Sequence, residues 1–295
     1  MSKGLKIGLT YIITLIAAFA IFGFMGWLFI DMMRNDSSTD LSSAVTEPTE
    51  YAPSSADRRT IIAVADLGDK KTDVVFMLIR FLPEDTNAVF LPLLPDTMCG
   101  GTTLYDLYRN SSGTGVRDGA ETALGIDIDK YVVMDSEAFT TFCGLFSGST
   151  YIIPYNLIFT EDTGAQTVIL QGTKGLDAET VKSLLTCPGY KNGEEERATS
   201  AVQIISTMLN AKLTSSYAEY MENTFNTIIN SGVTTDISRF DFDESREALR
   251  YTVTRTDRFC RPAFPTGTFS EEGGYVLDPS FITAVDRLFK IGEDT

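Results

Sequence analysis

The chain has 295 residues, with 24 basic and 40 acidic side chains and a formal net charge of −16. This acidic balance argues against nucleic acid as a partner, because phosphate binding requires a basic surface. The sequence also contains no histidine, which removes Ser-His-Asp and Cys-His catalysis and histidine-ligated zinc. Any chemistry must therefore come from carboxylates, hydroxyls, cations or a hard metal ion.

An uncharged apolar run extends from Ile7 to Ile30, with lysines before it and Asp31 after it. About 20 apolar residues in a helix cross a hydrocarbon core of roughly 30 Å, so we expect residues 7–30 to form one transmembrane helix. The charges predict a cytoplasmic tail at residues 1–6 and an extracytoplasmic remainder, anchored in the cell membrane. An A-x-A-like triplet at Ala18–Ala20 gives the alternative of a cleaved signal peptide. The apolar run continues beyond it, which favours an uncleaved anchor.

Residues 31–57 are rich in Ser, Thr, Pro and acidic side chains, which predicts a disordered stalk. No second linker follows, so residues 58–295 are expected to form one domain. Its first strands are expected at Thr60–Asp66, Asp73–Phe81 and Asn87–Leu93, with a hairpin between the second and third. Their near-continuous apolar character indicates cover on both faces of the sheet.

Further along the chain, predicted helices and strands alternate. The expected helices are Val116–Leu124, Ser136–Phe146, Asp177–Thr186, Glu195–Lys212 and Ser216–Ile229, and the expected strands are Lys130–Met134, Thr150–Pro154 and Thr167–Leu170. This alternation predicts an α/β fold with a central mixed β-sheet flanked by helices.

The four cysteines are Cys99, Cys143, Cys187 and Cys260. Their spacing contains no C-x-x-C motif, so no zinc cluster or thioredoxin-like site is indicated. Two disulfides in any of three connectivities, or four buried thiols, remain equally compatible with the sequence.

Three segments in order carry a family resemblance. The first is KTDVVFMLI with the strand ending in LLPDT, which is similar to the motif pair R-S-D-T and P-R-D-T. The second, ALGIDIDKYVVMDSEAFTTFCGLFSGSTYIIP, is similar to a turn, strand, helix and strand unit. The third, LDAETVKSLLT through EEERATSAVQIISTML, is similar to a helix followed by D-x-x-R-x-x-R-Q-Q. Together they resemble the LytR-CpsA-Psr family of cell-envelope proteins.

The resemblance implies a transferase that moves a glycopolymer from a polyprenyl-pyrophosphate carrier to peptidoglycan, with the lipid tail in an apolar pocket. Cleaving a pyrophosphate requires charge to be neutralised on the phosphate oxygens. Carboxylates suit Mg²⁺, and arginines grip phosphate with two hydrogen bonds. By resemblance, Asp73 and Asp96 are expected to hold Mg²⁺, whereas Lys71 and Arg197 are expected to be the catalytic cations.

The chain departs from the family where arginines are expected: Lys71, Pro95 and Ser200 stand at such positions, and Thr186 and Pro188 stand near a further pair. Among these arginine positions only Arg197 is retained. A proline cannot donate a hydrogen bond, and a lysine offers a point charge without the arginine fork. These departures predict reduced or lost transfer, so the sequence leaves open whether the protein is an enzyme. The alternatives are a non-catalytic envelope binding or scaffold protein and an extracytoplasmic sensor domain.

Each candidate residue also has a purely structural interpretation. Asp73 and Asp96 could simply end strands, Lys71 could lie in a solvated turn, and Arg197 could form an exposed ion pair with Glu194. The apolar residues of the strands and of the predicted helix Glu195–Lys212 are more often core than a lipid tunnel. They are Val75, Met77, Ile79, Phe90 and Ile205.

Overall fold

The computed structural model describes residues 51–161 and 163–290, so the expected tail, membrane span and most of the stalk lie outside the described residues. Within these described ranges, none of the helices combines the length and hydrophobicity that a membrane crossing requires. Tyr51 begins the second of two compact units. Its ring lies 6.0 Å from that of Tyr251, and Ser55–Asp57 form a short 3-10 helix. The folded unit therefore starts earlier than the expected boundary at Arg58.

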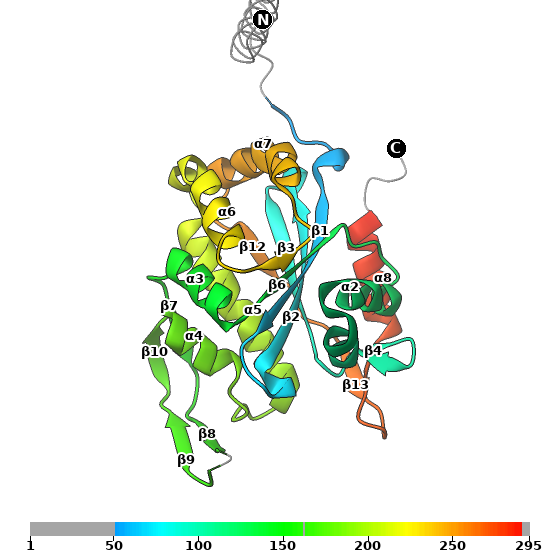
Figure 1. The fold of residues 1–295 in the computed structure, drawn as a ribbon, viewed down its shortest axis with the longest axis vertical. Helices are drawn as coiled ribbons and strands as arrows, with labels where there is room; N and C mark the ends of the chain where they lie inside the picture. The colour runs from blue at the N-terminus through cyan, green and yellow to red at the C-terminus, as the bar shows by residue number, and fades with distance from the viewer. Residues whose placement is uncertain (1–50, 162, 291–295) are drawn as a thin grey trace, which may run out of the picture. The chain divides into compact units, whose positions relative to one another are not determined.

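The centre of this unit is a six-stranded sheet with the strand order β11-β6-β1-β2-β3-β12 (Figure 1). The strands are β1 (Arg59–Asp66), β2 (Val74–Leu82), β3 (Asn87–Leu93), β6 (Lys130–Met134), β11 (Thr234–Thr235) and β12 (Cys260–Pro262). Strands β1, β2 and β3 are antiparallel neighbours, whereas β6 runs parallel to β1 and β12 runs parallel to β3. This confirms the predicted mixed sheet and the predicted hairpin between β2 and β3.

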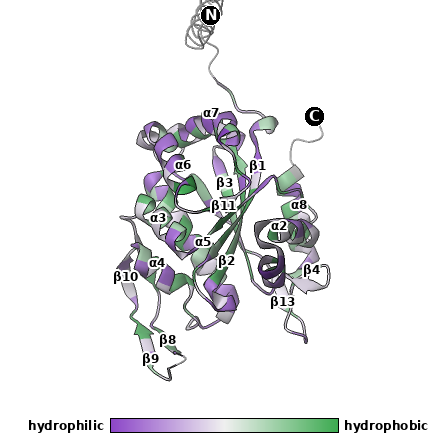
Figure 2. Ribbon diagram, in the orientation of Figure 1, coloured by the Kyte–Doolittle hydropathy of each residue, from purple (hydrophilic) through white to green (hydrophobic). Residues whose placement is uncertain are grey.

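Seven α-helices lie within the described ranges of the chain. They are α2 (Leu104–Leu124), α3 (Ser136–Phe146), α4 (Ala178–Leu185), α5 (Gly193–Lys212), α6 (Met221–Ile229), α7 (Arg239–Arg255) and α8 (Pro279–Lys290). Helices α2 and α8 cover one face of the sheet, and α3, α4 and α5 cover the other (Figure 1). Successive side chains of β2 point to opposite faces of the sheet and belong to two separate hydrophobic cores. Met77 packs toward α5, and Phe76 packs toward α2. Both faces of the sheet are therefore covered, as the apolar strands predict. Helix α7 is largely hydrophilic (Figure 2).

Two expected strands lie outside the central sheet. Strand β7 (Thr150–Ile153) pairs with β10 (Gly172–Gly175), and β8 (Leu157–Thr160) pairs with β9 (Gln166–Ile169). The remaining short strands also form separate pairs. They are β4 (Met98–Cys99) with β5 (Thr102–Thr103), and β13 (Gly267–Phe269) with β14 (Tyr275–Leu277). The strand predictions were correct in type, but local sequence does not specify which partner a strand joins.

Helix α2 begins earlier than predicted, and it is kinked. Ser112 has φ 52° and ψ −140°, which separates residues 104–111 from residues 113–124. A Cβ added at Gly115 would lie 2.7 Å from the carbonyl oxygen of Leu107. The glycine therefore allows the two segments to approach closely, and the first segment reaches the end of the sheet where β1 and β3 finish.

The four cysteines are free and buried. The structure therefore contains four thiols rather than any of the three disulfide connectivities that the sequence left open.

Candidate functional site

Three aspartates lie where strands of the central sheet begin or end. Asp66 is the last residue of β1, Asp73 immediately precedes β2, and Asp96 follows β3. The β2–β3 register pairs Phe76 with Leu93, so continuing this ladder outward brings Asp73 and Asp96 to the same edge. The structure thus places the two predicted metal ligands at one end of the sheet.

Lys71 and Asp96, which were both predicted site residues, form an ion pair through Nζ and Oδ1. The same Nζ atom lies 5.8 Å from the centre of the Tyr105 ring. The carboxylate of Asp73 instead accepts a hydrogen bond of 3.0 Å from the backbone N–H of Lys70. Lys71 is therefore a partner of Asp96 and not only a residue of a solvated turn.

Asp66 and Tyr108 belong to the same edge, although the sequence did not indicate them. The Tyr108 hydroxyl donates a hydrogen bond of 2.8 Å to Asp66 Oδ2. Burial, assisted by this hydrogen bond, raises the pKa of the Tyr108 hydroxyl. The sequence did contain a signal for Asp66: it is an acidic residue that ends an apolar strand at the same edge as Asp73 and Asp96. Tyr108 lies on the segment of α2 that was not predicted.

The residues of this edge do not fit a divalent metal ion as they are arranged. Mg²⁺ needs several oxygen ligands at 2.0–2.1 Å in near-octahedral geometry. The carboxylates of Asp66, Asp73 and Asp96 each have a donor within the protein. Across residues 51–161 and 163–290, no three acidic or cysteine side chains converge in a way that could hold a metal.

Arg197 occupies a buried structural position, with 3% of the residue exposed. Its Nη1 atom donates to the carbonyl oxygen of Leu185 at 2.7 Å, and its Nε atom donates to Glu194 at 3.0 Å. Nη2 is also paired with Glu194. The guanidinium therefore joins the end of α4 to the start of α5. This is the ion pair that was considered as an alternative for Arg197, although it is buried rather than exposed.

Asp73 lies in a cleft beside α4. Asp73, Ser183 and Thr186 line two adjoining hollows of about 720 and 440 Å³, and Pro188 also lines the larger one. Thr186 and Pro188 stand near arginine positions of the resembled family. The cleft therefore brings together Asp73, a predicted metal ligand, and two positions near which the family has arginines. The charged residues of the two hollows are Lys70, Lys182, Asp73, Glu161 and Glu179. Because acids outnumber bases, this lining is a poor complement to a pyrophosphate.

An apolar cavity of about 150 Å³ lies between the sheet and helices α3 and α5. Its lining includes all five residues predicted as core or lipid tunnel: Val75, Met77, Ile79, Phe90 and Ile205. Ala63 and Ala65 of β1 line it too, and their small side chains leave part of the space open. Leu185 lines the cavity and the next residue, Thr186, lines the cleft, so the end of α4 contributes to both.

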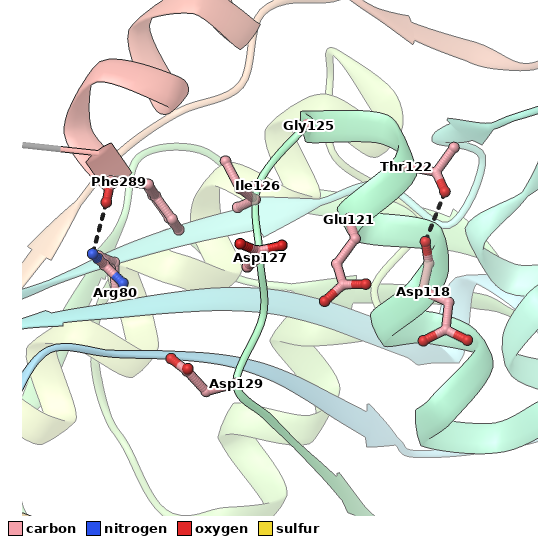
Figure 3. A pocket seen from close by; sticks show the side chains of 9 residues that line it. All are labelled: Arg80, Asp118, Glu121, Thr122, Gly125, Ile126, Asp127, Asp129 and Phe289. Carbon is pink, nitrogen blue, oxygen red and sulfur yellow. Dashed lines mark hydrogen bonds between the residues drawn. The ribbon is translucent and has the colours of Figure 1, made fainter. Parts of the chain in front are cut away.

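A third hollow, of about 710 Å³, lies beside α2 and the end of α8 (Figure 3). Its acidic residues are Asp118, Glu121, Asp127 and Asp129. Two of them bond to nearby backbone: Asp129 accepts from Thr60 N–H at 2.6 Å, and Glu121 accepts from Ile128 N–H at 2.9 Å. Its Arg80 donates to the carbonyl oxygen of Phe289 at 2.7 Å. This predominantly acidic lining would repel a phosphate-bearing ligand.

No family model and no curated protein sequence matches the chain. Solved structures do match. A protein from Eubacterium siraeum DSM 15702, described as a transcription regulator, has a TM-score of 0.73 and 21% identity over 86% of this chain and 100% of that one. TagV from B. subtilis has a TM-score of 0.60 and 16% identity over 80% of this chain and 97% of that one. TagT bound to LI-WTA has a TM-score of 0.59 and 14% identity, over 85% and 96%.

TagT and TagV are LytR-CpsA-Psr proteins. At identities this low the likeness shows the fold alone, and it confirms that this chain has a LytR-CpsA-Psr-like fold.

Proposed function

We propose that this protein is a membrane-anchored protein of the cell envelope that binds a polyprenyl-linked glycopolymer but transfers it to peptidoglycan slowly or not at all. The observation that carries the proposal is the apolar cavity together with the polar cleft lined by Asp73 and Thr186. A lipid tail and a polar head need two such environments. The apolar run at residues 7–30 supports the anchor, and the LytR-CpsA-Psr-like fold supports a glycopolymer ligand.

The size of the cavity defines how the lipid would enter. An apolar space of about 150 Å³ accepts a benzene-sized group, which is close to one isoprene unit. The cavity is partly open, so a longer polyprenyl chain would extend through its open side, and we expect α3 and α5 to separate from the sheet as more of the chain enters. Phe139 and Phe142 of α3 and Leu209 of α5 line the cavity, so their side chains would move. Lipid binding should accordingly change the hydrogen-exchange protection of α3 and α5 more than that of α2.

The charges around the cleft support the loss of transfer. Thr186 and Pro188 line it in place of guanidinium groups. Arg197 is committed to Glu194 and to the end of α4, and Lys71 is committed to Asp96. Among the residues that line the cleft, Lys70 and Lys182 alone would offset negative charge developing on a pyrophosphate. Each missing preorganised donor typically costs about 10²–10³ in rate.

The decisive experiment uses the purified full-length protein in detergent. Equilibrium binding of a polyprenyl-pyrophosphate-linked sugar is measured first, and transfer of the sugar to peptidoglycan fragments is measured on the same preparation. We expect saturable binding with transfer at or near the uncatalysed rate. Absence of binding would refute the proposed ligand, whereas rapid transfer abolished by Asp73→Ala would refute the proposed loss of activity.

A further inference from the structure

The end of the sheet that carries Asp66, Asp73 and Asp96 also carries a positive charge, the ammonium group of Lys71. Lys71 Nζ pairs with Asp96 Oδ1, and it also lies 5.8 Å from the centre of the Tyr105 ring. The backbone holds these groups together, because the N–H of Tyr105 donates to the carbonyl oxygen of Pro95 at 3.0 Å. The first turn of α2 is thereby fixed to the loop that carries Asp96. Lys71 thus has two partners, from two different segments of the chain.

The other two acids of this edge are also satisfied without an external cation. Asp66 accepts the Tyr108 hydroxyl at 2.8 Å, and Asp73 accepts a backbone N–H at 3.0 Å. The ammonium group is the only one of these three donors that carries a full positive charge. It would repel an incoming divalent ion, and this repulsion is strong where water is partly excluded. Side-chain exposures of 39% for Lys71 and 22% for Asp96 describe such a partly shielded pair.

We propose that Lys71 is an internal substitute for a divalent metal ion at this edge, so that the protein binds no Mg²⁺ there. Removing the positive charge at residue 71 would then free Asp96 for a divalent cation, and Asp66 and Asp73 would have to move toward it, because the three carboxylates do not converge in the present arrangement. The resemblance of the sequence to metal-dependent transferases implies the opposite. The inference concerns the acids alone, so it does not depend on whether the protein binds a lipid.

The test titrates Mn²⁺ into metal-free, full-length protein in detergent and follows the loss of the free-ion signal by electron paramagnetic resonance. Wild-type protein and Lys71→Arg, which keeps the charge, should bind no Mn²⁺ at about 1 mM. Lys71→Ser, which is neutral and adds an oxygen, should bind at least about tenfold more tightly than wild type. Adding Asp96→Asn to Lys71→Ser should abolish the gain.

Two results would overturn the inference. Mn²⁺ binding by the wild-type protein that Asp96→Asn removes would show that Lys71 does not replace the metal. No gain in Lys71→Ser would show that these acids cannot form a metal site even without the lysine. Thermal unfolding of each variant checks that it is folded, and Lys71→Gln provides a second neutral replacement should the serine variant not fold. Because no lipid is present, neither result depends on the outcome of the lipid-binding experiment.

Discussion

Filling the apolar cavity should stabilise the protein and weaken lipid binding at the same time. Ala63 lines the cavity from β1, and Ala63→Leu adds three carbon atoms. At about 0.8 kcal/mol for each buried methylene, complete burial would contribute roughly 2.4 kcal/mol. The leucine must still fit within about 150 Å³, so we expect a net gain of about 1–2 kcal/mol. For a domain of this size, that gain raises Tm by about 2–8 °C.

The same leucine occupies space that a polyprenyl chain would need. We therefore expect the affinity for polyprenyl phosphate to fall at least about tenfold, a loss of about 1.4 kcal/mol of binding free energy. Thermal unfolding by circular dichroism and equilibrium lipid binding measure the two effects. Ala56→Leu, at an exposed position of the short 3-10 helix, is the matched control and should change neither. A raised Tm with unchanged lipid affinity would show that the lipid does not use this cavity, and a lowered Tm would show that the space cannot accept the side chain.

Three further changes test other parts of the structure. Ser112→Gly should stabilise the protein by about 1 kcal/mol in urea unfolding, since φ 52° with ψ −140° strains any residue except glycine; Ser112→Ala should give no gain. Arg197→Met should lower the free energy of unfolding by about 2–4 kcal/mol, because the carbonyl of Leu185 and the carboxylate of Glu194 lose their guanidinium partner. Impaired ligand binding at unchanged stability would contradict this structural role. Burial tends to raise the pKa of Asp241, but hydrogen bonds from Ser238 and Lys130 outweigh it and lower that pKa to about 2. The stability contributed by ionised Asp241 is thus present above about pH 4 and is lost as the pH falls toward 2, so Asp241→Asn should flatten this part of the acid-unfolding curve.

The central strands were predictable because their information is local. Strands β1, β2 and β3 are short apolar runs separated by turn residues, and four residues, 83–86, close the hairpin between β2 and β3. The place of β7 was not predictable in the same way. Its partner β10 and its position outside the main sheet depend on contacts that the alternation of Thr150–Ile153 does not encode.

Helix α7 was missed for a different reason. Most of its residues are polar, and only a few, including Phe242, Ala248 and Val253, are buried. A usable signal was present in the capping box formed by Ser238 and Asp241 at its start. The short helix η4 (Ser215–Glu219) precedes α6, and together they occupy the range where one longer helix was expected.

The sequence suggested that Asp73 and Asp96 lie at the same end of the sheet, but not which side chains pair there. Strand ends place Asp73 and Asp96 at one edge, which the order of the strands suffices to suggest. The partners come from elsewhere in the chain: Lys71 lies 25 positions before Asp96, and Tyr108 lies 42 positions after Asp66. Such pairs depend on how the turn before β2 and the first half of α2 pack, and a single sequence carries no local signal for that.

Lipid binding and phosphoryl transfer make different physical demands, so one can persist without the other. A lipid tail requires only apolar space, which the alanines of β1 provide beneath α3 and α5. Transfer requires cations that are free to meet the phosphate, and such uncompensated charges destabilise a folded domain. In this chain Lys71 and Arg197 are neutralised by Asp96 and Glu194 before any ligand arrives. A ligand would have to break these pairs to recruit either cation. These pairs are thus consistent with the proposed lipid binding without rapid transfer.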